Sequence, residues 1–80
     1  MNYVDIGIVA QEAAIATRLP IQVAFVYLNC NRWEISFRQV EGDERQFLAL
    51  VNIDSSYDRD TVQYEIERQL IEHYAGELLN

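Results

Sequence analysis

The sequence has few of the residues that build metal, redox and phosphate sites. Its 80 residues include one cysteine, one histidine, three glycines and no lysine. One cysteine excludes an intramolecular disulfide, and one Cys with one His cannot supply the tight ligand set of a structural zinc site. A G-x-x-x-x-G-K-[ST] phosphate loop needs lysine, and the three glycines are too far apart for a G-x-G-x-x-G turn. We therefore expect no metal and no cofactor.

Long hydrophobic runs are also missing. No apolar stretch approaches the roughly 20 residues of a membrane-spanning helix. Met1–Asp5 places an acid where a signal peptide carries basic residues. A small secreted domain would normally contain several cysteines. We therefore expect a cytoplasmic protein with no membrane partner.

Positive charge is scarce, and the formal net charge is −7. The excess lies in residues 41–80, which carry ten acids against three arginines. Such a surface repels polyanions. We expect no direct binding of nucleic acid, and a basic protein is the favoured kind of partner.

What is present predicts a single α+β domain over residues 1–80. Residues 5–18 are rich in alanine and favour a helix that Asn2 or Asp5 caps and that ends before Pro20. On one side of this helix, apolar residues recur at helical spacing: Val4, Ile8, Ile15 and Leu19.

Residues 21–28, 33–40 and 45–53 predict a three-stranded antiparallel meander, since they are β-branched, aromatic or alternating. The connections are a loop at Asn29–Arg32, where an asparagine would accept positive φ, and a turn at Glu41–Glu44. Eleven residues are assigned to the core face: Ile21, Val23, Phe25, Tyr27, Trp33, Ile35, Phe37, Phe47, Ala49, Val51 and Ile53.

A C-terminal helix is expected from about Asp58 to Ala75, capped by Asp58 or Asp60 and followed by Gly76 as its terminating residue. It should pack on the sheet through an i, i+4 stripe made of Val62, Ile66, Leu70 and Tyr74. The predicted order is helix, three strands, helix.

One other interpretation of this order remains open. If residues 21–28 were a helix opened by Pro20, residues 15–28 would resemble a helix-turn-helix followed by a β wing. Helix, three strands and helix is also the order of double-stranded-RNA-binding domains. Those domains need a basic helix start, whereas here the second helix begins Asp58-Arg59-Asp60. RNA binding is therefore not expected.

Catalytic and calcium chemistry both have weak candidates. Cys30 falls in the hairpin loop and His73 late in a helix, so no sequence feature pairs them as nucleophile and base. In the acidic loop, oxygen-bearing residues take EF-hand spacing, but Arg59 stands where the sharp turn needs glycine. Loop solvation and helix capping account for these residues: Asp54, Ser56, Asp58, Asp60 and Glu65. We expect that the protein is not an enzyme. A small enzyme that uses loop 54–60 is kept as an alternative, after the two binding hypotheses given below.

Two surfaces are candidates for partner contact. The sheet face opposite the core would place aliphatic side chains beside the polar middle strand, and such patches commonly mark contacts. Its candidate residues are Val26, Leu28, Leu48 and Leu50. The alternative is that the first helix covers this face. An acidic surface is the second candidate: Asp54, Asp58, Asp60, Glu65 and Glu72.

These features predict a non-catalytic, acidic protein-binding module that acts by occupancy. The more specific hypothesis is an inhibitor of a nucleic-acid-handling protein, of the anti-defence or DNA-mimic type. In such an inhibitor, carboxylates imitate phosphates. The alternative is a structural or regulatory subunit of a larger complex, or a homodimer, bound through the apolar sheet face.

Overall fold

A computed structural model of the chain describes the backbone of residues 1–40 and 47–79 and the side chains of residues 1–40 and 49–74. The predicted turn Glu41–Glu44 lies outside these residues. The order of elements is α1 (Tyr3–Thr17), β1 (Ile21–Asn29), β2 (Arg32–Gln39), β3 (Phe47–Asp54) and α2 (Arg59–Leu79). The predicted α+β fold is therefore confirmed, and the helix proposed for residues 21–28 is wrong.

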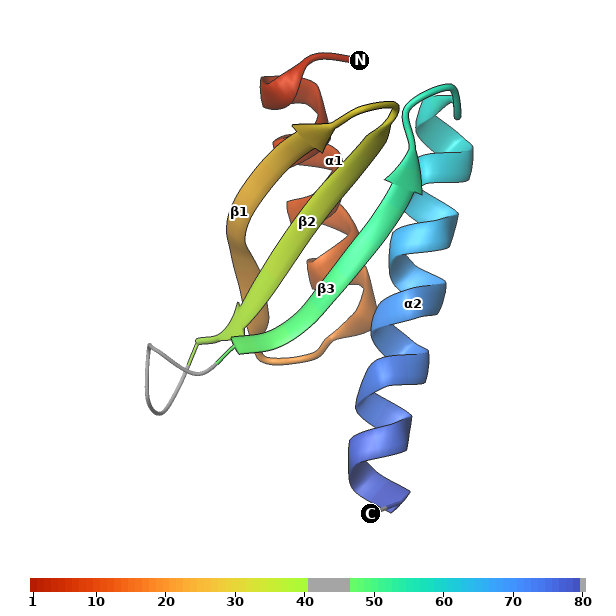
Figure 1. Ribbon diagram of the computed structural model, residues 1–80. Coiled ribbons are helices and arrows are strands. Elements are labelled where there is room, and N and C mark those ends of the chain that lie inside the picture. Colours follow the sequence, from red (N-terminus) through yellow and green to blue (C-terminus); the bar gives the residue numbers. More distant parts are fainter. Residues whose placement is uncertain (41–46, 80) are drawn as a thin grey trace.

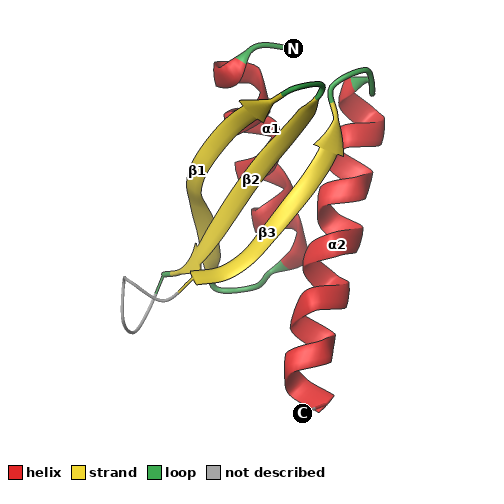
Figure 2. Ribbon diagram, in the orientation of Figure 1, coloured by secondary structure: helices red, strands yellow, loops and turns green. Residues whose placement is uncertain are grey.

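Both helices lie on the same face of one antiparallel sheet of order β1-β2-β3 (Figures 1 and 2). Along this face α1 contacts β1, α2 contacts β3, and the helices contact each other. One continuous apolar core lies between the helices and the sheet. The alternative in which α1 covers the second face of the sheet is wrong. Neither helix, in its described part, is long and apolar enough to cross a membrane.

A capping box starts α1. The Asn2 side chain accepts from the Asp5 N–H at 2.8 Å, and Asp5 Oδ2 accepts from the Asn2 N–H at 3.4 Å. The helix ends at Arg18, which adopts a left-handed conformation with φ of 62°, two residues before Pro20.

The buried side of α1 differs from the stripe that its spacing suggested. Its buried residues are Ile6, Val9, Ala10, Ala13 and Ala14. Val4, Ile8 and Ile15 are exposed instead, and Leu19 is partly buried beyond the end of the helix. Small alanines on the inner side let α1 approach the sheet and α2 closely, which explains why this side is the buried one.

A β-bulge in β1 reverses which side chains face the helices. Val23 pairs with Phe37, but Phe25 then pairs with Ser36, so one extra residue lies in β1 between Val23 and Phe25. Because side chains alternate along a strand, the extra residue moves Val26 to the core side and Phe25 to the opposite face. The prediction that Phe25 and Tyr27 face the core is wrong.

The other predicted core positions agree with the structure where they are described. Trp33, Ile35 and Phe37 on β2 are buried, as are Ala49, Val51 and Ile53 on β3. The side chain of Phe47 lies outside the described part. On α2, Val62, Ile66 and Leu70 are buried and Tyr74 packs against the core, confirming the stripe.

The β1–β2 turn and the end of α2 differ from expectation. The β1–β2 turn consists of Cys30 and Asn31, and Cys30 rather than an asparagine has the positive φ of 58°. The helix α2 continues through Gly76 to Leu79, so the prediction that Gly76 ends it is wrong. Figure 1 shows the last turns of α2 extending past the sheet.

Candidate protein-binding face

The sheet face opposite the helices is built of four cross-strand rows, since directly paired residues share a face. We call it the outer face. The central row is Phe25, Ser36 and Leu50. On one side of it lie the row Tyr27, Glu34, Asn52 and then the row Asn29, Arg32, Asp54. On the other side Gln22 pairs with Arg38.

Large apolar side chains are exposed on this outer face. Phe25 is 72 % exposed, Tyr27 58 % and Leu50 48 %. Together with Glu34 and Ser36 they line an open hollow of about 390 Å³. No described element of the chain covers this hollow, because both helices pack on the other side of the sheet. Exposed aromatic and aliphatic side chains gathered around a hollow are typical of a protein contact.

Ser36 lies at the centre of the outer face and is buried there by its neighbours. The residue is 8 % exposed, and its hydroxyl oxygen has no hydrogen-bond partner among the described residues. A buried hydroxyl without a partner costs about 1–3 kcal/mol relative to a satisfied one. The centre of this face is therefore polar, and no described residue satisfies its hydroxyl.

Charges of both signs border the apolar centre. Glu34 and Arg38 flank Ser36 at two residues on either side of it, and both are half-buried. With its amide oriented so that the oxygen faces Arg38, Gln22 accepts from Arg38 Nε at 2.9 Å and from Nη2 at 3.0 Å. Neither Glu34 nor Arg38 forms an ion pair with another described residue.

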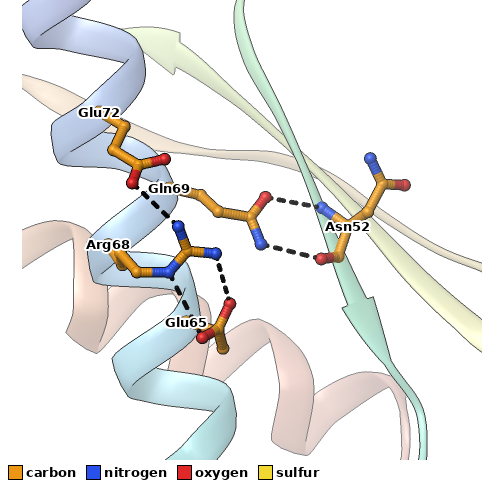
Figure 3. A network of polar contacts seen from close by, with 5 residues as sticks. All are labelled: Asn52, Glu65, Arg68, Gln69 and Glu72. Atoms are coloured by element: carbon orange, nitrogen blue, oxygen red, sulfur yellow. Dashed lines mark hydrogen bonds and ion pairs between the residues drawn. The ribbon is translucent and has the colours of Figure 1, made fainter.

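The two edges of the sheet are partly closed by glutamines from the helices. Gln11 of α1 accepts from the Val23 N–H at 3.1 Å, beside the bulge in β1. Gln69 of α2 accepts from the Asn52 N–H at 3.3 Å and donates to the Asn52 carbonyl at 3.0 Å (Figure 3). Such cover protects an edge strand against pairing with another chain. Each edge strand thus has one residue whose backbone is already paired with a helix side chain.

The predicted acidic residues near the start of α2 have structural roles. Asp54 accepts from the Ser56 N–H and hydroxyl at 2.8 and 2.7 Å, and these bonds lower the pKa of its carboxyl. Asp58 caps α2 by accepting from the Thr61 N–H at 2.8 Å, which lowers its pKa in the same way. Asp60 is exposed in the first turn of α2.

Glu65 and Glu72 are joined by Arg68 on one side of α2 (Figure 3). Arg68 lies 2.8 Å from Glu65 and 2.9 Å from Glu72. The bonds to Arg68 lower the pKa of Glu65, and the two carboxylates raise the pKa of Arg68. The acidic surface is therefore divided into two parts, one formed by turn and capping carboxylates and one partly neutralised by an arginine.

Of the predicted apolar contact residues, Leu50 lies on the outer face. Val26 packs against the core and Leu28 pairs with Trp33, so their placement on the outer face is wrong because of the bulge. Leu48 belongs to β3, at the second register shift, and its side chain lies outside the described part. Phe25 and Tyr27 were not predicted to lie on this face. The apolar run from Val23 to Leu28 fits both alternation phases, so only its aromatic content could have indicated them.

The two residues considered as nucleophile and base, Cys30 and His73, belong to different elements of the fold. No three His, Cys, Asp or Glu side chains among them are grouped so as to hold a metal ion. The Cys30–Asn31 turn lies beside the end of β3, since the Asn31 carbonyl accepts from the Ser55 N–H. His73 lies on α2, fourteen positions after its first residue Arg59, which corresponds to roughly 20 Å of helix.

Comparison with known proteins adds no relative: no family model, no curated protein and no solved structure matches this chain.

Proposed function

We propose that this protein is a non-catalytic binding module. It acts by binding a protein partner through its outer sheet face and so occupying a site on that partner. One observation carries the proposal. Phe25, Tyr27 and Leu50 are exposed on the sheet face that neither helix covers, around the Ser36 hydroxyl, which no described residue satisfies. Covering these side chains removes apolar surface from water, which is the main favourable term in association.

The energetics favour an aromatic anchor at this site. Phenylalanine and tyrosine bury large areas and are enriched among the residues that dominate binding energy. Here they project from a sheet that is held rigidly by the core beneath it, with Ile35, Phe37 and Val51 fully or almost fully buried. Little conformational entropy has to be lost to present them, which favours a protein partner of matching shape.

A capture experiment tests the proposal. The purified protein, immobilised through its N-terminus, is incubated with lysate of its source cells beside the variants Phe25→Ser and Leu50→Ser. We expect a protein that wild type retains and both variants lose. Ile15→Ser, which changes an exposed apolar residue on α1, is the matched control and should retain it. Equal capture by all four proteins would show that the outer face is not the contact.

The acidic inhibitor of a nucleic-acid-handling protein is a second candidate. It is supported by the lowered pKa values of Asp54 and Asp58, which keep both exposed carboxylates charged in mildly acidic solution. Their negative charge, within a chain of net charge −7, suits a basic partner. The test is displacement of DNA from a basic DNA-binding protein at low salt by wild type, with the Asp54→Asn, Asp58→Asn double variant expected to displace less. The absence of displacement by wild type would exclude this candidate.

A further inference from the structure

We infer that the outer face binds a second copy of this chain, with the two sheets face to face. The two-fold axis lies between the sheets, runs at right angles to the strands and passes Ser36. This inference rests on the proposed function, because it uses the same face and names its partner. Three observations carry it: the exposed apolar centre, the balance of charge on the face and the order of charges along β2.

The outer face is electrically balanced although the chain is not. Four charged residues belong to its rows, namely Arg32 and Arg38 with positive charge and Glu34 and Asp54 with negative charge. They cancel, whereas the whole chain has a net charge of −7. Two copies repel each other over most of their surface, since like charges oppose approach. The four charges of the outer-face rows add no net charge to this repulsion, and they give a basic partner no charge advantage there.

The order Glu34, Ser36, Arg38 along β2 is complementary to itself when reversed. A two-fold axis at right angles to the strands reverses β2, so Glu34 of one copy faces Arg38 of the other, twice. An axis parallel to the strands would instead place Glu34 opposite Glu34 and Arg38 opposite Arg38. Like charges facing each other across an interface are costly, so the charge order selects the first arrangement.

The same axis brings the apolar centres together. Phe25, Ser36 and Leu50 form one row, and the reversed copy places its own row over it. Phe25 then lies against Phe25 and Leu50 against Leu50, beside the hollow of about 390 Å³ that these residues line with Tyr27. Packed sheets are about 10 Å apart, a distance that a glutamate and an arginine from opposite sheets together span. The small side chain of Ser36 at the axis permits this approach.

The first test is the oligomeric state of the purified chain, by light scattering and sedimentation over a concentration series. We expect a reversible dimer of twice the 9.3 kDa chain mass. Phe25→Ser and Leu50→Ser should each raise the dimer dissociation constant at least tenfold. The exposed helix residues Ile15 and Tyr64 provide matched controls, and Ile15→Ser and Tyr64→Ser should leave the constant within about twofold.

Charge reversal tests the axis. Glu34→Arg or Arg38→Glu alone sets like charges opposite each other and should weaken the dimer at least tenfold, while the double variant should restore it. A mixture of the two single variants should form a heterodimer. With the parallel axis, in contrast, neither the single nor the double variant would change the constant much. Circular dichroism of each variant verifies that it is folded.

Two results would overturn the inference. One is a wild-type chain that stays monomeric to millimolar concentration. The other is a dimer that none of the outer-face substitutions weakens. A monomer that still captures a different protein through Phe25 and Leu50 would leave the proposed function standing, whereas a monomer without such capture would remove both.

Discussion

Gln69 on α2 uses both ends of its carboxamide on the backbone of one residue, Asn52 in β3. Its oxygen accepts from the Asn52 N–H at 3.3 Å, and its nitrogen donates to the Asn52 carbonyl at 3.0 Å. The side chain thus takes the place of a neighbouring strand at the edge of the sheet (Figure 3). It satisfies two backbone groups and at the same time fixes α2 along β3.

Replacing Gln69 should therefore cost stability and open the edge. We expect Gln69→Ala to lower the free energy of unfolding by about 1–2 kcal/mol, because two hydrogen bonds are lost. Urea denaturation measures this change, and light scattering on storage measures edge-to-edge association. Gln63→Ala, at a half-buried position on the same helix, should change the free energy by less than about 0.5 kcal/mol. Equal effects of the two substitutions would contradict the role of Gln69.

The bulge in β1 predicts opposite behaviour for two adjacent residues. Val26→Ala removes a side chain that packs against the core and should destabilise the fold by about 1 kcal/mol. Phe25→Ala removes an exposed side chain and should change the free energy of unfolding by less than about 0.5 kcal/mol in dilute solution. Urea unfolding of both variants measures the difference. A larger loss in Phe25→Ala than in Val26→Ala would mean that Phe25, and not Val26, faces the core.

We expect Asp58 to make a contribution to stability that depends on pH. Its pKa in the folded protein is lowered by the hydrogen bonds from Thr61, so folding favours the charged form. The contribution is present above the unfolded pKa of about 4 and is lost as the pH falls through the lower folded value.

The matched variant is Asp58→Asn, because asparagine also caps helices but does not titrate. The unfolded pKa of an aspartate is about 4. As the pH falls from about 5 to about 2, across this value, wild type should therefore lose more stability than this variant. Urea midpoints across that range measure the loss. Parallel curves for the two proteins would show that the Asp58 cap contributes nothing to acid sensitivity.

We expect that removing the Ser36 hydroxyl stabilises the fold. Its hydroxyl is buried without a partner among the described residues, so Ser36→Ala should raise the free energy of unfolding by about 1 kcal/mol in dilute solution. Thermal and urea unfolding measure the gain. Ser56→Ala is the contrasting control and should lower stability, because the Ser56 hydroxyl donates to Asp54 at 2.7 Å. A loss of stability in Ser36→Ala would mean that the hydroxyl is satisfied in solution.

Local patterns determined most of the secondary structure. Strict alternation fixed β2, with Trp33, Ile35 and Phe37 toward the core. The i, i+4 stripe from Val62 to Tyr74 fixed the buried side of α2. Both patterns are unambiguous because polar residues separate the apolar ones, so only one face of each element can be buried.

The sequence could not determine the face assignment in β1 or the buried side of α1. Val23–Leu28 contains no charged residue, so a bulge can shift the alternation without exposing a charge or burying one. The helix α1 is apolar on more than one side, and either Val4, Ile8 and Ile15 or Ile6, Val9 and the alanines could have faced inward.

By itself, then, the sequence predicted the order of elements, with residues 21–28 left open between strand and helix, and it determined which faces of β2 and α2 are buried. Only the tertiary structure decided that both helices share one face and that Phe25 and Tyr27, rather than Val26 and Leu28, lie on the other. The physical reason is that burial depends on which surfaces meet. Close packing of the small residues of α1 against the sheet and α2 selected the inner face, and the bulge then placed the aromatic side chains outside.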